Sequence, residues 1–179
     1  MDKTISVVNN YKLFIVDNGF VLPICQELGI AENEFSSKIK EYKGKYKDKI
    51  RTKEYHNLVP LGIRTSLAYL ISGTSVAPTF KANYVALGDS VTPPTINDTI
   101  LGNEVKRGIF SNRYAIDNVA YLDKYFGSTE VGGNTYLEIG IFVDGTAGVN
   151  TGYLLSKVAI DEQLAINESL TINATITIL

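Results

Sequence analysis

The fold is decided by the stretch Leu170-Thr171-Ile172-Asn173-Ala174-Thr175-Ile176-Thr177-Ile178, which alternates apolar and polar side chains without a break. Successive side chains of a β-strand point to opposite faces, so the apolar residues of this stretch all share one face. An apolar face opposite a polar one is typical of a half-buried antiparallel strand. We therefore expect the chain to end in an antiparallel sheet.

Five further strands are predicted upstream of this one, at Tyr84–Leu87, Val105–Ile116, Val119–Phe126, Tyr136–Val143 and Tyr153–Ile160. The segments between them are rich in Gly, Asn, Asp and Pro, the residues that turns favour. No helical pattern separates the strands. Short strands with regular turns predict an antiparallel β-sandwich or jelly-roll-like domain over residues 82–179.

Residues 1–75 have a different texture, and we expect a mixed, partly helical region there. The pattern of residues 1–30 leaves strand and helix both open. Phe35, Ile39 and Tyr42 follow a helical period, and Leu58–Ile71 predicts a second helix that ends before Gly73. The segment Ser75–Thr79 is expected to be a linker. The predicted class is mainly β, with an α-helical N-terminal part.

Composition narrows the function classes. The chain has 179 residues, 45% of them hydrophobic, and a formal net charge of −2, so nucleic acid is not the expected partner. Cys25 is the only cysteine, which excludes an intramolecular disulfide and favours synthesis in a reducing cytoplasm. No secretory leader pattern is present, and no apolar run approaches the roughly 18 residues of a membrane span.

A basic stretch interrupts this acidic background. Residues 38–54 carry eight basic and three acidic side chains, a local charge of +5 that leaves −7 for the rest of the chain. Tyr42, Tyr46 and Tyr55 lie among these lysines. We interpret the stretch as the solvated face of a helix. The alternatives are nucleic-acid binding, with tyrosines stacked on bases, and contact with an acidic face of a neighbouring subunit.

One motif suggests catalysis. The apolar residues 84–87 lead into Gly88-Asp89-Ser90, which resembles the first block of the GDSL-type ester hydrolases, where the serine is the nucleophile. A serine nucleophile needs a positioned base, and the only histidine, His56, lies upstream of Ser90 with no Asp-x-x-His block anywhere. We interpret the motif as a strand followed by a turn.

No other chemistry stands out. One histidine and one cysteine far apart do not form a zinc site, and the acidic residues show no calcium-loop spacing. Glu104, Glu130 and Glu138 could pair as acid and base, but their expected role is in solvated strands or ion pairs between subunits. We therefore expect no catalytic residue, no metal and no cofactor, and we predict that the protein is not an enzyme.

The order of the β-region carries a further resemblance. Asn83-Tyr84-Val85-Ala86-Leu87-Gly88 is followed by Asp98-Thr99-x-Leu101-x-Asn103-Glu104-Val105-x-Arg107 and by Tyr125-Phe126. Then come Leu137-Glu138-Ile139-Gly140-Ile141-Phe142-x-Asp144-Gly145 and Gly152-x-Leu154-Leu155-Ser156-Lys157-Val158. This order, over about residues 82–179, is similar to a module of tailed-phage virion proteins, the N-terminal domain of tail-collar fibre proteins. Residues 1–75 match nothing in it.

The resemblance implies attachment within a virion, at oligomeric and often trimeric joints. It predicts a virion protein made in the host cytoplasm that binds other virion proteins and forms a homo-oligomer. A tail, baseplate or fibre-attachment subunit, or hub, is the leading hypothesis, a capsid decoration or head-fibre protein the alternative, and a GDSL-like hydrolase the most distant one. The expected protein-interaction residues are those that carry the resemblance: Arg107, Tyr125, Phe126, Glu138 and Phe142. Their alternative role is to maintain the fold.

Overall fold

The computed structural model describes residues 7–74 and 78–178, and it is mainly β, with two antiparallel sheets. The chain forms two compact units, each of which contains one sheet. Unit 1 combines residues up to Tyr55 with Phe110–Thr135 and the residues from Gln163 onward. Unit 2 combines His56–Ile109 with Tyr136–Glu162. The prediction of a mainly β protein with antiparallel sheets is confirmed.

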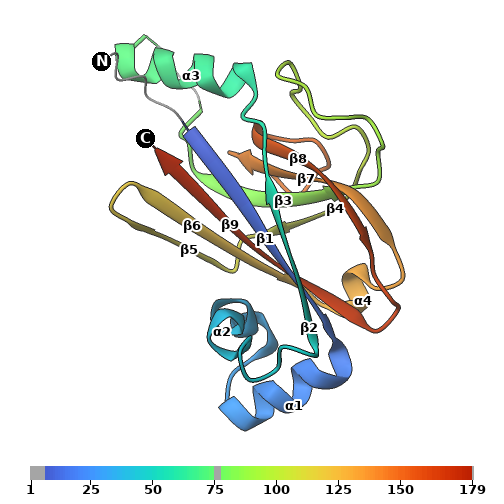
Figure 1. Cartoon of the computed structure of the whole chain (residues 1–179). Helices are drawn as coiled ribbons and strands as arrows, with labels where there is room; N and C mark the ends of the chain where they lie inside the picture. The colour runs from blue at the N-terminus through green and yellow to red at the C-terminus, as the bar shows by residue number, and fades with distance from the viewer. Residues whose placement is uncertain (1–6, 75–77, 179) are drawn as a thin grey trace. The chain divides into compact units, whose positions relative to one another are not determined.

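The sheet of unit 1 has five strands in the order β2-β1-β9-β6-β5 (Figure 1). Their bounds are β1 Val7–Asp17, β2 Ile50–His56, β5 Asn112–Ile116, β6 Val119–Phe126 and β9 Glu168–Ile178. The alternating stretch of the sequence forms β9, which lies in the middle of the sheet. It pairs with β1 along its whole length on one side and with β6 on the other.

The two faces of this sheet differ because directly paired residues of an antiparallel ladder point to the same side. One face carries the apolar residues of β9 with Leu13 and Ile15 of β1, which are fully buried. The opposite face carries Phe14 and Val16, and the helices of unit 1 cover this end of it. Threonine and asparagine of β9 lie on this second face, so its polar side is also largely buried.

Unit 1 contains the helices α1 Asn18–Leu28, η1 Glu32–Glu34, α2 Phe35–Tyr42 and α4 Ser128–Val131. Asp17 caps α1 by accepting a hydrogen bond from the Gly19 amide at 2.8 Å, and Gly29 ends the helix in a left-handed conformation. Phe35 and Ile39 of α2 are fully buried with Phe14 of the sheet. The helical period of Phe35, Ile39 and Tyr42 therefore predicted α2 correctly.

The sheet of unit 2 has four strands in the order β4-β3-β7-β8. Their bounds are β3 Ala82–Gly88, β4 Glu104–Ile109, β7 Thr135–Val143 and β8 Tyr153–Gln163. Helix α3, Leu61–Ser72, belongs to the same unit and ends at Gly73, close to its predicted bounds. One face of β3 and β7 carries the buried Val85, Leu87 and Ile139. The other face carries Ala86 and Phe142, which form a small apolar cluster with Leu101 and Leu154.

Two sequence predictions are altered by the structure. The single strand predicted at Val105–Ile116 is two strands, β4 and β5, because the chain leaves unit 2 after Ile109 and enters unit 1 at Phe110. The boundary between residues 1–75 and 82–179 is crossed by hydrogen bonds, since β1 pairs with β9. The division of the chain into regions 1–75 and 82–179 that fold separately stays a prediction. Residues 75–77 of the expected linker lie outside the described part of the chain.

Candidate functional site

The side chains of the five predicted interaction residues are all buried. Arg107 lies on β4, Glu138 and Phe142 lie on β7, and Tyr125 and Phe126 lie on β6. The exposed fraction of the Arg107 side chain is 5%, and those of Phe126 and Phe142 are zero. The structure brings Arg107 and Phe142 together in unit 2, whereas Glu138 belongs to a separate network of that unit and the other two lie in unit 1. Their burial supports the alternative role, in which they hold surface segments in place from below.

Glu138 is the centre of an ion-pair network in unit 2. The side chain is 1% exposed, and its carboxylate lies 3.0 Å from the ammonium of Lys157. The same ammonium lies 3.0 Å from Asp98. The carboxylate oxygens of Glu138 also accept hydrogen bonds from the backbone amides of Gly102, at 3.0 Å, and Asn103, at 2.8 Å. The Glu138 side chain therefore holds the backbone of the segment 89–103 against the sheet.

The ionisation of this network follows from its contacts. Burial by itself would lower the pKa of Lys157, but hydrogen bonds to Asp98 and Glu138 outweigh burial and raise it above the ordinary lysine value. Burial likewise opposes the charged form of Asp98, yet hydrogen bonds from Thr95 and Lys157 keep its pKa below the usual value. Both shifts favour the charged forms, so the contacts persist as ion pairs at neutral pH.

Gly88, Asp89 and Ser90 help to hold the same segment. A side chain at Gly88 would collide with Glu138 and with the backbone oxygen of Asn103, so glycine allows this close approach. The Asp89 carboxylate accepts a hydrogen bond from the Asn103 side chain at 2.7 Å, and the Ser90 hydroxyl accepts one from the Thr92 amide at 3.2 Å. The motif that resembles a hydrolase block thus forms the end of β3 and the start of an irregular segment, since residues 89–95 adopt no regular turn.

Arg107 holds a second segment, residues 144–152. Its guanidinium makes two parallel hydrogen bonds to Glu104, at 2.5 and 2.8 Å, and the Glu104 carboxylate accepts the Asn150 amide at 2.9 Å. The guanidinium also donates to the carbonyl oxygen of Thr146 and to the hydroxyl of Thr151, at 2.7 and 2.8 Å. A planar, five-donor group suits such a set of acceptors. The two buried charges are therefore paired and fully engaged.

The base of this segment is fixed at the end of β7. Asn83 and Gly145 exchange two hydrogen bonds, at 2.7 and 2.9 Å, between the asparagine side chain and the glycine backbone. Asp144 adopts a positive φ of 53°, and its carboxylate accepts hydrogen bonds from the amide and hydroxyl of Thr79. The predicted Asp-Gly turn is thus the start of a loop held at several points.

Gly152 closes this segment in a conformation that only glycine adopts without strain, with φ at 87°. A Cβ there would lie 2.7 Å from Gly145 Cα. We expect Gly152→Ala to lower the free energy of unfolding by at least about 2 kcal/mol, as measured by urea denaturation. Gly148→Ala is the matched control, because Gly148 has no positive φ and a Cβ there would make only ordinary van der Waals contacts, 3.4 Å from Thr151 and 3.8 Å from Thr146. An equal loss in both variants would contradict this account.

Tyr125 and Phe126 lie on β6 of unit 1. The Tyr125 hydroxyl is within 3.4 Å of Asn18 of α1 and of Glu32 of η1, and its ring meets Phe35 of α2 edge-on at 6.3 Å. Burial raises the pKa of Tyr125 to about 12, so the hydroxyl stays protonated and can donate. Tyr125 therefore links the sheet to α1, η1 and α2. Phe126 follows it on the opposite face of β6 and is fully buried.

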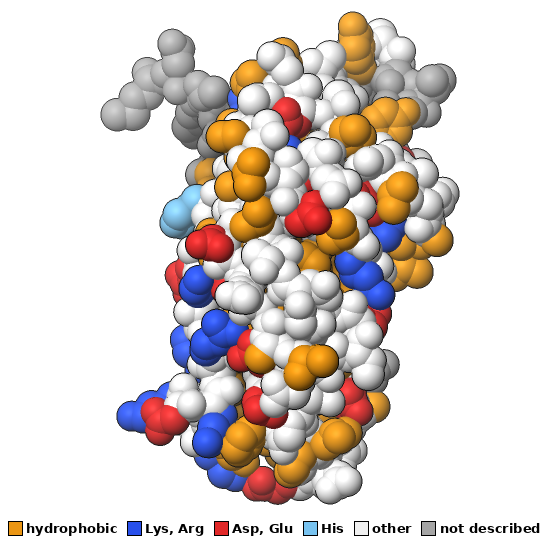
Figure 2. All heavy atoms as spheres, turned by 90° about the vertical axis from the view of Figure 1, so that its right-hand side faces the viewer, with side chains coloured by type: hydrophobic (Ala, Val, Ile, Leu, Met, Phe, Trp, Pro, Cys, Tyr) orange, Lys and Arg blue, Asp and Glu red, His pale blue; other side chains and the backbone are white. Residues whose placement is uncertain are grey.

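The held segment 89–103 and helix α3, both in unit 2, expose apolar side chains. The exposed fractions are 84% for Val91 and 72% for Ile71 of α3, and the Leu61 amide donates to the Ile96 oxygen at 2.7 Å, which joins the helix to the segment. Hydrophobic side chains are scattered over the whole face that Figure 2 presents. We call this set the apolar surface; its members are Leu61, Tyr69, Leu70, Ile71, Val91, Ile96 and Ile100.

Several of these residues were not among the predicted site residues. Asp98, Glu104 and Lys157 belonged to the order of motifs that carried the phage resemblance, but no partner could be assigned to them. A signal was present at Glu138, because a charge inside an otherwise apolar strand must be paired when it is buried. The sequence contains no signal that α3 is exposed, since an apolar helix is normally expected to be covered.

Two kinds of feature are absent from the described residues. Residues 7–74 and 78–178 contain no group of three or more His, Cys, Asp or Glu side chains arranged to hold a metal ion. Within the same ranges, no helix has both the length and the apolar character of a membrane span. The candidate site is accordingly the apolar surface of unit 2, together with the buried ion pairs that hold its backbone.

Comparison with known proteins adds no relative to this picture. No family model, no curated protein and no solved structure matches this chain. The phage resemblance and the interaction residues taken from it therefore stay predictions.

Proposed function

We propose that this protein is a non-enzymatic structural subunit of a tailed-phage particle that acts by binding other protein subunits. A place in the tail, baseplate or fibre attachment is the leading form of the proposal, and a capsid decoration or head-fibre protein is the alternative. The virion setting rests on the order of motifs in the β-region. The binding role rests on one structural observation, the exposure of the apolar helix α3.

Helix α3 is apolar on most sides, and yet only Ile63 among its residues is buried. Its single charged residue is Arg64. A helix that is hydrophobic all round is normally buried, and contiguous exposed apolar side chains mark sites of protein contact. In α3 the exposed members are Leu61, Tyr69, Leu70 and Ile71. This exposure supports a protein partner that covers the helix.

The neighbouring segment 89–103 supports the same conclusion. Its backbone is held by Glu138 at Gly102 and Asn103, so its exposed apolar side chains are presented on a fixed backbone. A surface that is already ordered loses little conformational entropy when a partner binds. Buried ion pairs that hold a segment of apolar surface are thus consistent with an assembly contact.

A second copy of the chain is the partner that we propose for the apolar surface. An almost uncharged surface has no charge pattern that would select a complementary partner, whereas the same apolar patch on two or three copies is self-complementary in a closed oligomer. A trimer agrees with the joints implied by the resemblance. As part of this proposal, we keep an antiparallel β-sandwich as the architecture, because each sheet has one face with fully buried apolar side chains.

The native mass in solution tests the proposal. We expect the wild type to form a homo-oligomer by light scattering over a range of concentrations, and Leu70→Asp/Ile71→Asp to be monomeric with an unchanged far-ultraviolet circular dichroism spectrum. Leu22→Asp/Ile166→Asp is the matched control, because both leucine and isoleucine there are exposed residues of unit 1. A monomeric wild type at the highest concentration reached would overturn the proposed contact.

Two further measurements separate the remaining alternatives. Locating the subunit in a phage particle by cryo-electron microscopy distinguishes a tail position from a capsid position. Ester hydrolysis by the wild type that is abolished in Ser90→Ala would replace the structural role with a hydrolase.

A further inference from the structure

The lysine-rich stretch of unit 1 does not form one helix face. Helix α2 ends at Tyr42, residues 43–49 form a series of turns, and β2 begins at Ile50. Lysines therefore project from a helix, a turn and an edge strand. Figure 2 shows Lys and Arg side chains gathered at the lower left of the view, with Asp and Glu between them. We call this set the basic surface; its members are Lys12, Lys38, Lys40, Lys43, Lys45, Lys47, Lys49, Arg51 and Lys53.

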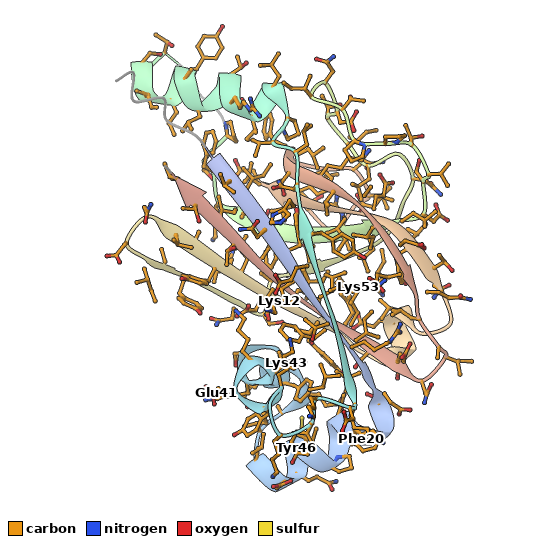
Figure 3. The ribbon with its side chains drawn as sticks, in the orientation of Figure 1. Lys12, Phe20, Glu41, Lys43, Tyr46 and Lys53 are labelled. Atoms are coloured by element: carbon orange, nitrogen blue, oxygen red, sulfur yellow. The ribbon has the colours of Figure 1, made fainter. Side chains whose placement is uncertain are left out.

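Lys12 extends the basic surface onto the sheet. It alternates with Phe14 and Val16 along β1, so it lies on the face of the sheet that α2 also covers. Figure 3 shows Lys12 and Lys43 beside β1 and α2, with Lys53 on the far side of β2. The basic surface is therefore built from α2, the turns at 43–49 and the strands β1 and β2, all in one unit.

Carboxylates of the same unit neutralise part of this charge. Lys45 lies 2.6 Å from Glu27, Arg51 lies 2.7 Å from Glu168, and Lys12 pairs with Glu54. The hydrogen bond between Lys45 and Glu27 raises the pKa of the lysine and lowers that of the glutamate. Exposed pairs of this kind contribute little to stability. They interrupt the positive charge of the surface. Its nine basic side chains still outnumber the five carboxylates among them, which are Glu27, Glu41, Asp48, Glu54 and Glu168.

Aromatic rings on the basic surface are covered by its lysines. The Lys45 ammonium lies 5.0 Å from the centre of the Tyr46 ring, and the Lys49 ammonium lies 4.5 Å from the centre of the Phe20 ring. The Tyr46 hydroxyl also donates to Glu27 at 2.9 Å. Tyr121 of β6 is stacked on Tyr114, with the Lys40 ammonium 5.9 Å from its ring centre.

These contacts weigh against nucleic acid as the partner. Single-stranded nucleic acid needs open rings on which bases stack and an uninterrupted row of cations along its phosphates. Here the rings of Phe20, Tyr46 and Tyr121 are occupied, and carboxylates interrupt the row of cations. A mixed surface with net positive charge instead complements a protein surface on which acidic side chains are in excess.

We propose that the basic surface of unit 1 docks an acidic surface of a neighbouring protein subunit. This inference rests on the proposed role in assembly and names the chemistry of a second partner. The apolar surface belongs to unit 2 and the basic surface to unit 1, so one chain offers two contacts of different chemistry. A subunit with two such contacts can connect copies of itself to a different protein, as a hub or adaptor does.

Lys43 and Lys47 are the residues that test this docking. Neither one takes part in an ion pair or ring contact recorded for the described residues, so their replacement leaves the internal contacts of unit 1 intact. The probe is a fluorescent poly-glutamate peptide, which presents acidic side chains without a defined fold. Binding is measured by fluorescence anisotropy at low and at physiological ionic strength.

We expect the wild type to bind the peptide with an affinity that falls as salt rises. Lys43→Glu/Lys47→Glu should weaken binding at least about tenfold, since two attractive contacts become repulsive. Arg64→Glu/Lys81→Glu is the matched control: it changes the net charge equally but alters exposed residues of unit 2. It should change the affinity less than about twofold, because neither substituted side chain belongs to the basic surface.

Four outcomes would overturn the inference. They are no peptide binding at low salt, unchanged binding by Lys43→Glu/Lys47→Glu, an equal loss in the control, and tighter binding of a single-stranded oligonucleotide of the same charge. The native mass of the same variants keeps this test separate from the assembly proposal. If Lys43→Glu/Lys47→Glu stays oligomeric but does not bind the peptide, both proposals stand. If it stays oligomeric and binds as the wild type does, only the docking proposal fails.

Discussion

Replacing Glu138 with glutamine is expected to lower the free energy of unfolding by about 3 kcal/mol, the lower end of the cost of removing one partner from a buried ion pair. The glutamine keeps the shape of the side chain but leaves the ammonium of Lys157, which is 3% exposed, with Asp98 as its remaining partner. The backbone amides of Gly102 and Asn103 also lose a charged acceptor. Urea denaturation followed by circular dichroism measures the loss.

The position of the effect can be tested as well as its size. We expect faster hydrogen exchange at the amides of Gly102 and Asn103 in Glu138→Gln, because these amides donate to the carboxylate directly. Glu41→Gln is the control, since Glu41 is exposed and lies 3.8 Å from Lys38. It should change stability by less than about 0.5 kcal/mol. A loss below about 1 kcal/mol in Glu138→Gln would contradict the proposed network.

Replacing Arg107 with alanine is expected to lower the free energy of unfolding by about 3–5 kcal/mol. The change leaves the Glu104 carboxylate buried without its cation, and it removes donors from the carbonyl oxygen of Thr146 and from Thr151. The guanidinium also lies 4.8 Å from the centre of the Phe142 ring and 5.3 Å from that of Tyr84, so apolar packing is lost too.

Arg107→Lys separates charge from geometry. Lysine keeps the positive charge but cannot make the paired hydrogen bonds to Glu104, so we expect it to recover less than half of the loss seen with alanine. Arg64→Ala and Arg64→Lys are the controls, because Arg64 is exposed on α3. Full recovery by lysine in chemical denaturation would show that charge alone accounts for the role of Arg107.

These two predictions alter the meaning of the residues singled out in the sequence. Arg107 and Glu138 were expected to contact partners, and the structure places them under the segments that reach the surface. A partner would meet side chains such as Val91 and Ile71 instead. The variants Arg107→Ala and Glu138→Gln should therefore disturb assembly indirectly, because they release the segments that the ion pairs hold.

The sequence pattern predicted an element correctly where the periodicity of its own neighbouring residues determines its secondary structure. The alternation of residues 170–178 predicted β9, and Val119–Phe126 was predicted with the bounds that β6 has. Helix α2 followed from the spacing of three apolar residues. Strand and helix periods are properties of neighbouring residues, so a single segment carries them. Strand β1 was left open because an apolar run of its length fits either structure.

Pairing over long distance was beyond the reach of the sequence. The contact of β1 with β9 joins residues at the two ends of the chain, from Val7 with Ile178 to Asp17 with Glu168. The single strand predicted at Val105–Ile116 was wrong, because the backbone changes sheets after Ile109. Neither event leaves a local signature, since partner choice depends on which remote strand completes the sheet.

The sequence by itself determined that this protein is mainly β, that Gly88-Asp89-Ser90 lacks the Asp-x-x-His block of a hydrolase, and that positive charge is concentrated in residues 38–54. Only the tertiary structure decided which charges are buried in pairs, as Glu138 is with Lys157, and which apolar residues stay exposed, as on α3. The physical reason is that burial and pairing depend on distances between segments that are remote in the chain, whereas composition and periodicity do not.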